Sequence, residues 1–236
     1  MKSLLYEDSL RINDYLEVKI PTVREILDNE EQYYGIVSSL VATPFDMMVQ
    51  LDDAGIDFTQ IDDYELFLMM FQTIRTQDTS LIFGDLDLSA FEPAINEETN
   101  MIVLIDQNTG AIIDKPIYFK IASALRKIHH LERNRKKAGN GEARRYLLER
   151  ARAKLKRQRR KQYDSQLDPL IIAMVNTQEF KYNYEETKAL SIFQFNESVI
   201  QIVKKVDYLN KMHGVYSGTV SVKDLKQGDL NWLTHK

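Results

Sequence analysis

Apolar residues recur along most of this chain at spacings of three and four, the pattern of amphipathic helices. The pattern predicts helices over residues 33–41, 44–54, 63–71, 116–131, 142–161 and 187–212, with a shorter apolar run over 170–175. Another helix is expected to start at Pro21-Thr22-Val23, where an early proline loses no hydrogen bond. Most of the chain is therefore expected to be helical.

Capping residues set the expected ends of these helices. Thr43-Pro44 is expected to supply N-cap and first turn, and Gly55 to end that helix. Asp62 or Asp63 caps the next helix, which is apolar almost all round from Tyr64 to Phe71. A buried core element explains that helix better than a groove for a partner. His213-Gly214 is expected to close the last long helix.

Two segments have the alternation of strands instead. Leu10 to Ile20 is expected to form a short hairpin, with Asn13-Asp14 in its turn. Short β-prone runs around Leu86, Leu88 and residues 102–113 predict a second β-element, with a turn over residues 106–110. The predicted fold class is mainly α, a helical bundle-like protein with a small β-hairpin element.

Two regions follow from this organisation. Residues 1–115 form an acidic helical region with the small β-element, and residues 116–236 form a helical region with a basic helix. The 44% hydrophobic content is enough for a packed core. Cysteine is absent, which excludes disulfides, a thiol nucleophile and Cys-ligated metals. With no signal-like or membrane-spanning stretch, a soluble intracellular protein is expected.

Positive charge is concentrated in one stretch. Residues 126–161 hold sixteen Lys and Arg against three acids, a balance of +13 in a chain whose net charge is -4. The remaining residues therefore carry -17. Such separation indicates either a polyanionic partner or contact with the protein's own acidic face.

The helix within this stretch has a narrow apolar stripe of Leu148, Ala151 and Leu155, so its C-terminal half is expected to project into solvent. Three interpretations stay open: contact with an acidic protein or with the acidic N-terminal half, a solvated face, or nucleic-acid binding. No aromatic residues interleave the cations for base stacking. The candidate partner-binding residues are Arg144, Arg145, Arg152, Lys156, Arg157, Arg159, Arg160 and Lys161.

The single tryptophan gives one more candidate contact. Trp232 lies between Leu230 and Leu233 near the C-terminus, and a disordered tail would rarely keep such a cluster. Trp232 is therefore expected to pack onto the body or onto another subunit, and it joins the candidate partner-binding residues.

Catalytic and metal-binding patterns are absent. His129 and His130 are adjacent, and adjacent helix residues point about 100° apart, so a structural role is expected for both. The chain has no calcium loop, phosphate-binding glycine loop or nucleophile elbow. No catalytic residue, metal ligand or cofactor is predicted, and the protein is expected not to be an enzyme.

Several segments resemble a known family. Gly55-Ile-Asp-Phe58 followed by Asp63-Tyr-Glu-Leu-Phe67 resembles proteins encoded in the structural gene clusters of tailed bacteriophages of Gram-positive hosts. Phe195-Asn-Glu-Ser198, the segment from His213 to Thr219, Leu230-Asn-Trp-Leu233 and the order Pro116-Ile-Tyr118 to His129 resemble the same proteins. The resemblance covers most of the chain, but it transfers no functional residue.

The resemblance implies a phage morphogenesis protein, either a tail assembly chaperone or a minor tail protein. Such a protein would bind phage structural proteins such as the tape measure or tail tube, and would act in the host cytoplasm during assembly or in the virion. A homo-oligomer is compatible with this role, and no membrane contact is expected. The alternative is a nucleic-acid-binding phage head or packaging protein that uses residues 126–161.

Overall fold

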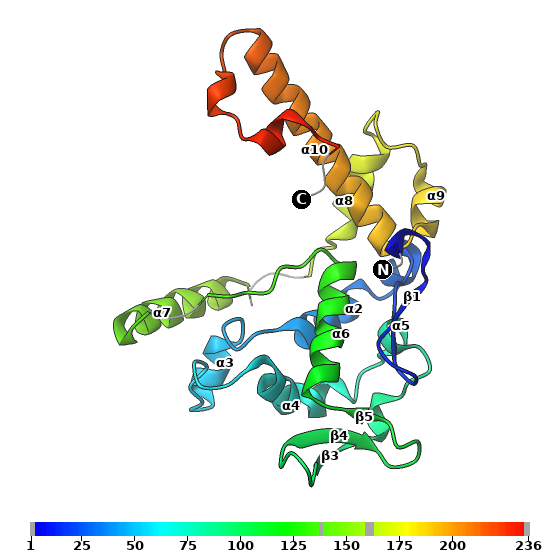
Figure 1. Cartoon of the computed structure of the whole chain (residues 1–236), viewed down its shortest axis with the longest axis vertical. Coiled ribbons are helices and arrows are strands. Elements are labelled where there is room, and N and C mark those ends of the chain that lie inside the picture. The colour runs from blue at the N-terminus through cyan, green and yellow to red at the C-terminus, as the bar shows by residue number, and fades with distance from the viewer. Residues whose placement is uncertain (1–2, 137–138, 159–162, 234–236) are drawn as a thin grey trace.

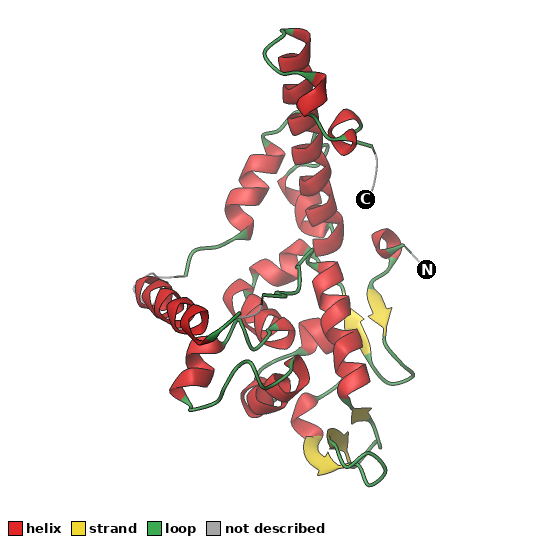
Figure 2. Ribbon diagram, turned by 60° about the vertical axis from the view of Figure 1, so that its left-hand side comes forward, coloured by secondary structure: helices red, strands yellow, loops and turns green. Residues whose placement is uncertain are grey.

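The computed structural model describes residues 3–136, 139–158 and 163–233 (Figure 1). This part of the chain is mainly helical, with two small antiparallel sheets (Figure 2), so the predicted mainly α fold with a small β-element is confirmed. The α-helices are α1 (Val23–Leu27), α2 (Glu30–Val41), α3 (Met48–Asp53), α4 (Asp63–Ile74), α5 (Ser80–Phe83), α6 (Lys115–Ile128), α7 (Gly141–Gln158), α8 (Leu167–Val175), α9 (Tyr184–Ala189) and α10 (Ile192–Tyr216). The strands are β1 (Ser9–Arg11), β2 (Glu17–Lys19), β3 (Phe91–Ile95), β4 (Ile102–Asp106) and β5 (Ile112–Ile113). Short 3-10 helices are η1 (Leu4–Tyr6), η2 (Leu88–Ala90), η3 (Val222–Asp224) and η4 (Gln227–Leu230).

One large core joins the two halves of the sequence. Helices α2, α4 and α6 bury its centre, where the rings of Phe67 and Tyr118 stack with centroids 4.6 Å apart. Residues of α8 and of the first turn of α10, including Ile171, Ile192 and Phe195, belong to the same apolar cluster. The core therefore holds residues from both sides of the predicted boundary at 115/116.

The N-terminal hairpin forms as predicted, with β1 antiparallel to β2. Thr22 is the N-cap of α1 and makes a capping box with Glu25. Pro21 was expected in the first turn of this helix, but it lies before the helix. The Pro21 carbonyl instead accepts the Ile192 N–H at 2.8 Å, which ties this corner to the start of α10.

The helix expected from Pro44 starts later, at Met48. The Asp46 carboxylate accepts hydrogen bonds from the backbone N–H and the hydroxyl of Thr43, at 2.9 and 2.7 Å. These bonds hold residues 43–47 in a turn, so the proline does not open the helix. Gly55, with φ of 74°, follows the end of α3 as predicted.

Helix α4 matches its sequence pattern closely. Asp62 is its N-cap and forms a capping box with Glu65. Most of its large apolar side chains lie in the core, whereas Met69 is half-exposed. The core interpretation of this helix is therefore correct.

The second β-element is a three-stranded antiparallel sheet in the order β3-β4-β5. Gly110 has φ of 72° in the turn between β4 and β5, as predicted. Leu86 and Leu88 do not lie in strands, and residues 88–90 form the 3-10 helix η2, so this part of the β prediction is wrong. The Asp87 side chain accepts the Ser89 N–H and favours that local turn over extended backbone.

Helix α10 differs from its predicted bounds at both ends. Ser191 caps it through a capping box with Gln194, and the separate helix α9 ends at Ala189, so α10 does not start near residue 187. The helix also runs through His213-Gly214 and ends at Tyr216, close to Gly218 with φ of 75°. In Figure 1, α10 rises out of the body at the top and α7 extends to the left.

Candidate interaction site

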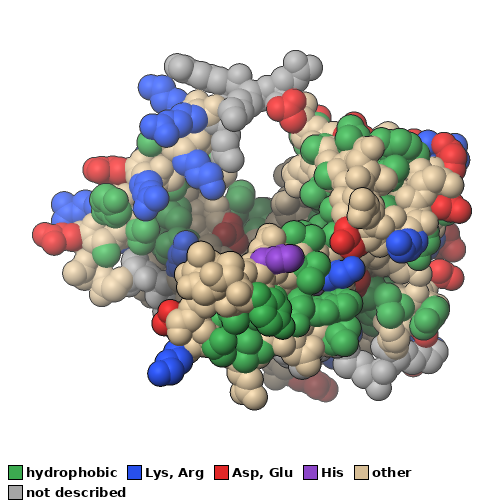
Figure 3. All heavy atoms as spheres, turned by 90° about the horizontal axis from the view of Figure 1, so that it is seen from above, with side chains coloured by type: hydrophobic (Ala, Val, Ile, Leu, Met, Phe, Trp, Pro, Cys, Tyr) green, Lys and Arg blue, Asp and Glu red, His purple; other side chains and the backbone are tan. Residues whose placement is uncertain are grey.

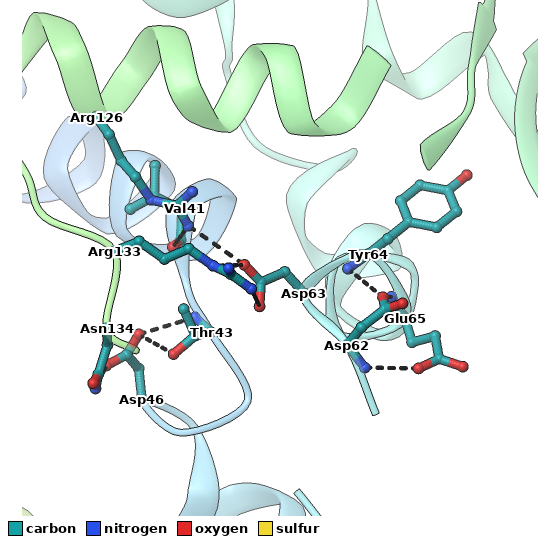
Figure 4. A network of polar contacts seen from close by, with 10 residues as sticks. All are labelled: Val41, Thr43, Asp46, Asp62, Asp63, Tyr64, Glu65, Arg126, Arg133 and Asn134. Carbon is teal, nitrogen blue, oxygen red and sulfur yellow. Dashed lines mark hydrogen bonds and ion pairs between the residues drawn. The ribbon is translucent and has the colours of Figure 1, made fainter. Parts of the chain in front are cut away.

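The basic segment begins at the C-terminal end of α6, where two arginines meet one buried carboxylate (Figure 4). Arg133 makes two bonds to Asp63, Nε to Oδ2 at 2.8 Å and Nη2 to Oδ1 at 3.1 Å. Arg126 Nη2 lies 3.7 Å from the same carboxylate and donates to the Val41 carbonyl at 2.6 Å. The Asp63 side chain is 3% exposed, so its charge is compensated almost entirely by these arginines.

Asn134 continues this attachment, because its amide donates to Asp46 Oδ1 at 2.8 Å. Asn134 also lines a cavity of about 610 Å³, together with Phe45, Phe58, Arg135 and Lys136. Residues 133 and 134, which follow α6, are thus held by polar contacts to the acidic N-terminal half.

Helix α7 itself docks on α3 through its apolar stripe. Leu148 is buried in a second small cluster with Met48, Val49, Leu51 and Phe58, and Leu147, Ala151 and Leu155 pack against this cluster. The C-terminal half of α7 was expected to project into solvent. This expectation is wrong for the residues up to Leu155, which pack on the second cluster. A stripe this narrow can dock because α3 presents a matching apolar surface and acidic side chains at its rim.

Two arginines flank the docked apolar stripe of α7 and form ion pairs with aspartates of the N-terminal half. Arg144 pairs with Asp57 at 2.6 Å, and its guanidinium lies 5.3 Å from the centre of the Phe58 ring. Arg152 bridges Asp52 at 2.7 Å and Asp53 at 2.6 Å. The hydrogen bonds that Arg152 donates to the two aspartates raise its pKa, and the pKa of Asp57 is lowered first by Thr59 and then by Arg144. The acidic pairs of the N-terminal half thus meet part of the basic segment.

The opposite face of α7 is exposed and basic. Figure 3 shows Lys and Arg side chains gathered at the left, where α7 lies. Apart from Arg152, which is paired with Asp52 and Asp53, the exposed cations in the described part of this helix are Arg145, Arg150, Lys154, Lys156 and Arg157. Tyr146 is 62% exposed and shares a face with Arg150, Lys154 and Arg157, at steps of four, four and three residues. We call these four residues the outer stripe.

The predicted partner-binding residues therefore divide into groups. Arg144 and Arg152 face the protein's own aspartates, whereas Arg145, Lys156 and Arg157 face solvent. The predicted residues Arg159, Arg160 and Lys161 lie outside the described residues. Sequence reasoning missed Tyr146, an exposed aromatic residue among the cations of α7, so the expectation that no aromatic residue interleaves them is wrong. The signal for Tyr146 was the step of four residues to Arg150, away from the Leu148 stripe.

Trp232 lies in the tail that follows α10, and its ring faces a lysine of that helix. Its ring is partly buried, and Lys205 Nζ lies 5.9 Å from the ring centre. Lys211 Nζ contacts Asp229 at 2.7 Å and Asp207 at 2.6 Å, so the tail around η4 folds back along α10.

The two histidines point to different elements. His129 is buried beside α2, with Nε2 at 2.9 Å from the Tyr33 hydroxyl. Burial, and secondly the charge of His130, lower the His129 pKa to about 4. His130 stacks on Phe193 and lies 3.6 Å from Glu197 of α10. Their side chains diverge, and within the described ranges no group of three or more His, Cys, Asp or Glu could hold a metal ion.

Comparison with known proteins gives one match. The profile of the family described as YomV second domain matches residues 157–236. YomV is a Bacillus phage-region protein. The C-terminal third of this chain is similar to that domain, which indicates a phage-related protein. No curated protein and no solved structure matches the chain. No helix in the described part of the chain is long and apolar enough to cross a membrane.

Proposed function

We propose that this protein is a non-enzymatic phage assembly protein, and that the exposed face of α7 binds an acidic surface of another phage structural protein. The tape-measure and tail-tube proteins are the first partners to test. The similarity of residues 157–236 to a domain of a phage-region protein supports the phage setting. The outer stripe of α7 is the observation that carries the proposed binding.

The outer stripe is held in a fixed position. The Leu148 stripe and the bridges of Arg144 and Arg152 anchor the inner face of α7, so the outer face is ordered before a partner arrives. A partner would then lose less conformational entropy on binding than with a flexible basic tail. Tyrosine and arginine are also the residues most enriched at the centres of protein interfaces.

The charge pattern favours a protein partner over nucleic acid. Glu142 and Glu149 lie exposed among the cations of α7 and would repel a phosphate backbone. Arg126, Arg133, Arg144 and Arg152 are already paired with the protein's own aspartates. A mixed, directional surface of this kind suits carboxylates at defined positions on a folded partner.

The proposal is tested with a triple substitution of the outer stripe. Arg150→Gln, Lys154→Gln and Arg157→Gln remove three exposed cations without touching the docked face. Binding to the purified tape-measure and tail-tube proteins of the same gene cluster is measured by biolayer interferometry at low and physiological salt. We expect the triple variant to lose about tenfold in affinity, which corresponds to about 1.4 kcal/mol. Wild-type binding should weaken with salt.

The matched control makes the same change in charge elsewhere. Lys120, Lys181 and Lys223 are exposed outside α7, and their replacement by Gln should leave the affinity unchanged. A short DNA duplex is used as a competitor. Competition by the duplex, with equal loss of duplex binding in the triple variant, would favour the nucleic-acid alternative. Equal affinity of the triple variant and the wild type would overturn the proposal.

A further inference from the structure

The cavity that Asn134 lines is built from three segments far apart in the sequence. They are residues 43–45 before α3, residues 58–63 leading into α4, and residues 133–136 after α6. Its volume of about 610 Å³ lies within the range of about 300–1,000 Å³ that is usual for ligand pockets. We call this cavity the basic pocket.

Hydrogen bonds hold the walls of the basic pocket in place. The backbone N–H and the hydroxyl of Thr59 donate to the Asp57 carboxylate, at 2.9 and 2.7 Å. Asn134 donates to Asp46, the carboxylate that also accepts the Thr43 N–H (Figure 4). The pocket is therefore formed before a ligand arrives, so binding would order little of the protein.

Two partly buried side chains give the pocket an accessible apolar surface. Phe45 and Ile61 pack against the second cluster but stay partly exposed. The Phe58 ring is only 4% exposed, because Arg144 lies 5.3 Å from its centre and Phe45 packs against it with centroids 5.8 Å apart. Phe58 is thus too buried to stack with a nucleic-acid base, whereas an aliphatic side chain can contact Phe45 and Ile61.

The charges that line the pocket leave an excess of positive charge. The Asp62 carboxylate pairs with Lys115, and Asp63 is paired with the arginines described above. Arg135 and Lys136 are exposed, and within the described residues neither side chain has an ion-pair partner. Two uncompensated cations beside an apolar surface favour a ligand that carries carboxylates next to an apolar side chain.

We infer that the basic pocket binds an extended acidic segment of another protein, with an aliphatic side chain against Phe45 and Ile61 and carboxylates on Arg135 and Lys136. Charge complementarity selects this partner, since the acids of the pocket are already paired within the protein. The inference does not use the outer stripe of α7 and goes beyond the proposed function.

Fluorescence anisotropy with two short labelled peptides tests this binding on the full chain. The first peptide has a single leucine among glutamates, and the second has glycine in place of that leucine. We expect the leucine peptide to bind and the glycine peptide to bind at least about tenfold more weakly, because only the leucine places apolar surface in the pocket. Neither peptide comes from a phage protein, so the result does not depend on the partners named under the proposed function.

Two variants of the pocket test where the leucine peptide binds. Arg135→Gln with Lys136→Gln should weaken its binding by about tenfold, because both carboxylate contacts are lost. Gln60→Trp places a large side chain at an exposed residue of the pocket wall and should also weaken binding, without a change in charge. Lys120→Gln with Lys181→Gln removes two exposed cations elsewhere and should bind as the wild type does. Circular dichroism checks that each variant keeps its helix content.

Four results would overturn the inference. The first is equal binding of the two peptides, and the second is equal binding of the leucine peptide by the wild type and the Arg135 and Lys136 variant. The third is loss of the leucine peptide only in the triple variant of the outer stripe, which would assign the peptide to α7. The fourth is binding of a short oligothymidylate that Gln60→Trp abolishes, which would assign the pocket to nucleic acid.

Discussion

Two neighbouring tyrosines show how differently a buried hydroxyl can be placed. Tyr64 donates to the carbonyls of Ile102 and Ile113, at 3.0 and 3.1 Å. Tyr118 is fully buried, and within the described part of the chain its hydroxyl has no hydrogen-bond partner. Burial raises the pKa of both hydroxyls above the usual range, so both stay protonated.

Removing these two hydroxyls should therefore have different effects. We expect Tyr118→Phe to leave the free energy of unfolding unchanged or to raise it by up to about 1 kcal/mol, because an unpaired polar group leaves the core. Tyr64→Phe, the matched substitution, should lower the free energy of unfolding by about 1–2 kcal/mol, because it removes the hydrogen bonds to the Ile102 and Ile113 carbonyls. Urea unfolding of both variants measures the difference. Equal losses of unfolding free energy in the two variants would show that the Tyr118 hydroxyl does have a hydrogen-bond partner.

His129 should make stability depend on pH. Its pKa is about 4 in the folded protein, against 6.5 when unperturbed, because burial disfavours the charged ring. Only the unfolded chain gains a proton between these values. Stability is therefore complete above pH 6.5 and falls as the pH drops towards 4, by about 3 kcal/mol from this residue.

Urea unfolding at several pH values between 7 and 4 checks this dependence. His129→Gln should lower stability at pH 7 through the changed contact with Tyr33, and should flatten the decline towards acid pH. His213→Gln is the control, since that residue is exposed on α10 and is not among the causes of the His129 shift, and it should keep the slope of the wild type. A slope unchanged in His129→Gln would assign the acid sensitivity to other groups. The divergence of the two rings was predictable from adjacency, but the Tyr33 contact, 96 residues away, was not.

Among the elements, α8 is capped by a residue far away in the sequence. Glu30 at the start of α2 is 7% exposed, and its carboxylate accepts the N–H groups of Gln166 and Leu167 at 2.7 and 3.0 Å. The hydroxyl of Ser165 donates to it at 2.5 Å. A carboxylate at a helix N-terminus satisfies free donors and complements the helix dipole.

Glu30→Ala should therefore uncap α8 and leave buried donors unpaired. We expect a loss of about 2–3 kcal/mol in unfolding free energy and faster amide exchange over 166–175. Glu31→Ala is the control because its exposed side chain lies next in sequence. Hydrogen exchange read by mass spectrometry separates the two variants. Equal protection of α8 in both would contradict the capping role.

Caps differ in how far the sequence reveals them. The box of Asp62 and Glu65 was readable because its partners lie three residues apart. The Glu30 cap was not, because its partners are 135 to 137 residues away. The docking of α7 was missed for the same reason. A stripe read along one helix does not reveal the surface that α3 offers it.

For the whole molecule, the charge separation was visible in the sequence, but the ion pairs that part of it forms within the protein were not. The count of +13 and -17 could not tell which cations face Asp52, Asp57 and Asp63 and which face solvent. The mainly α class followed from periodicity alone, because long periodic segments are its strongest signal. The shared core of α6, α8 and α10 depends on contacts between segments far apart in the chain.

The tail that covers one side of α10 also ties the far half of this helix to residues that follow it in the sequence. Lys205 lies over the Trp232 ring, and Lys211 pairs with Asp229. A tag or fusion that displaced residues 227–233 would uncover that side of α10. The main core, which holds the first turns of α10, would keep its own contacts.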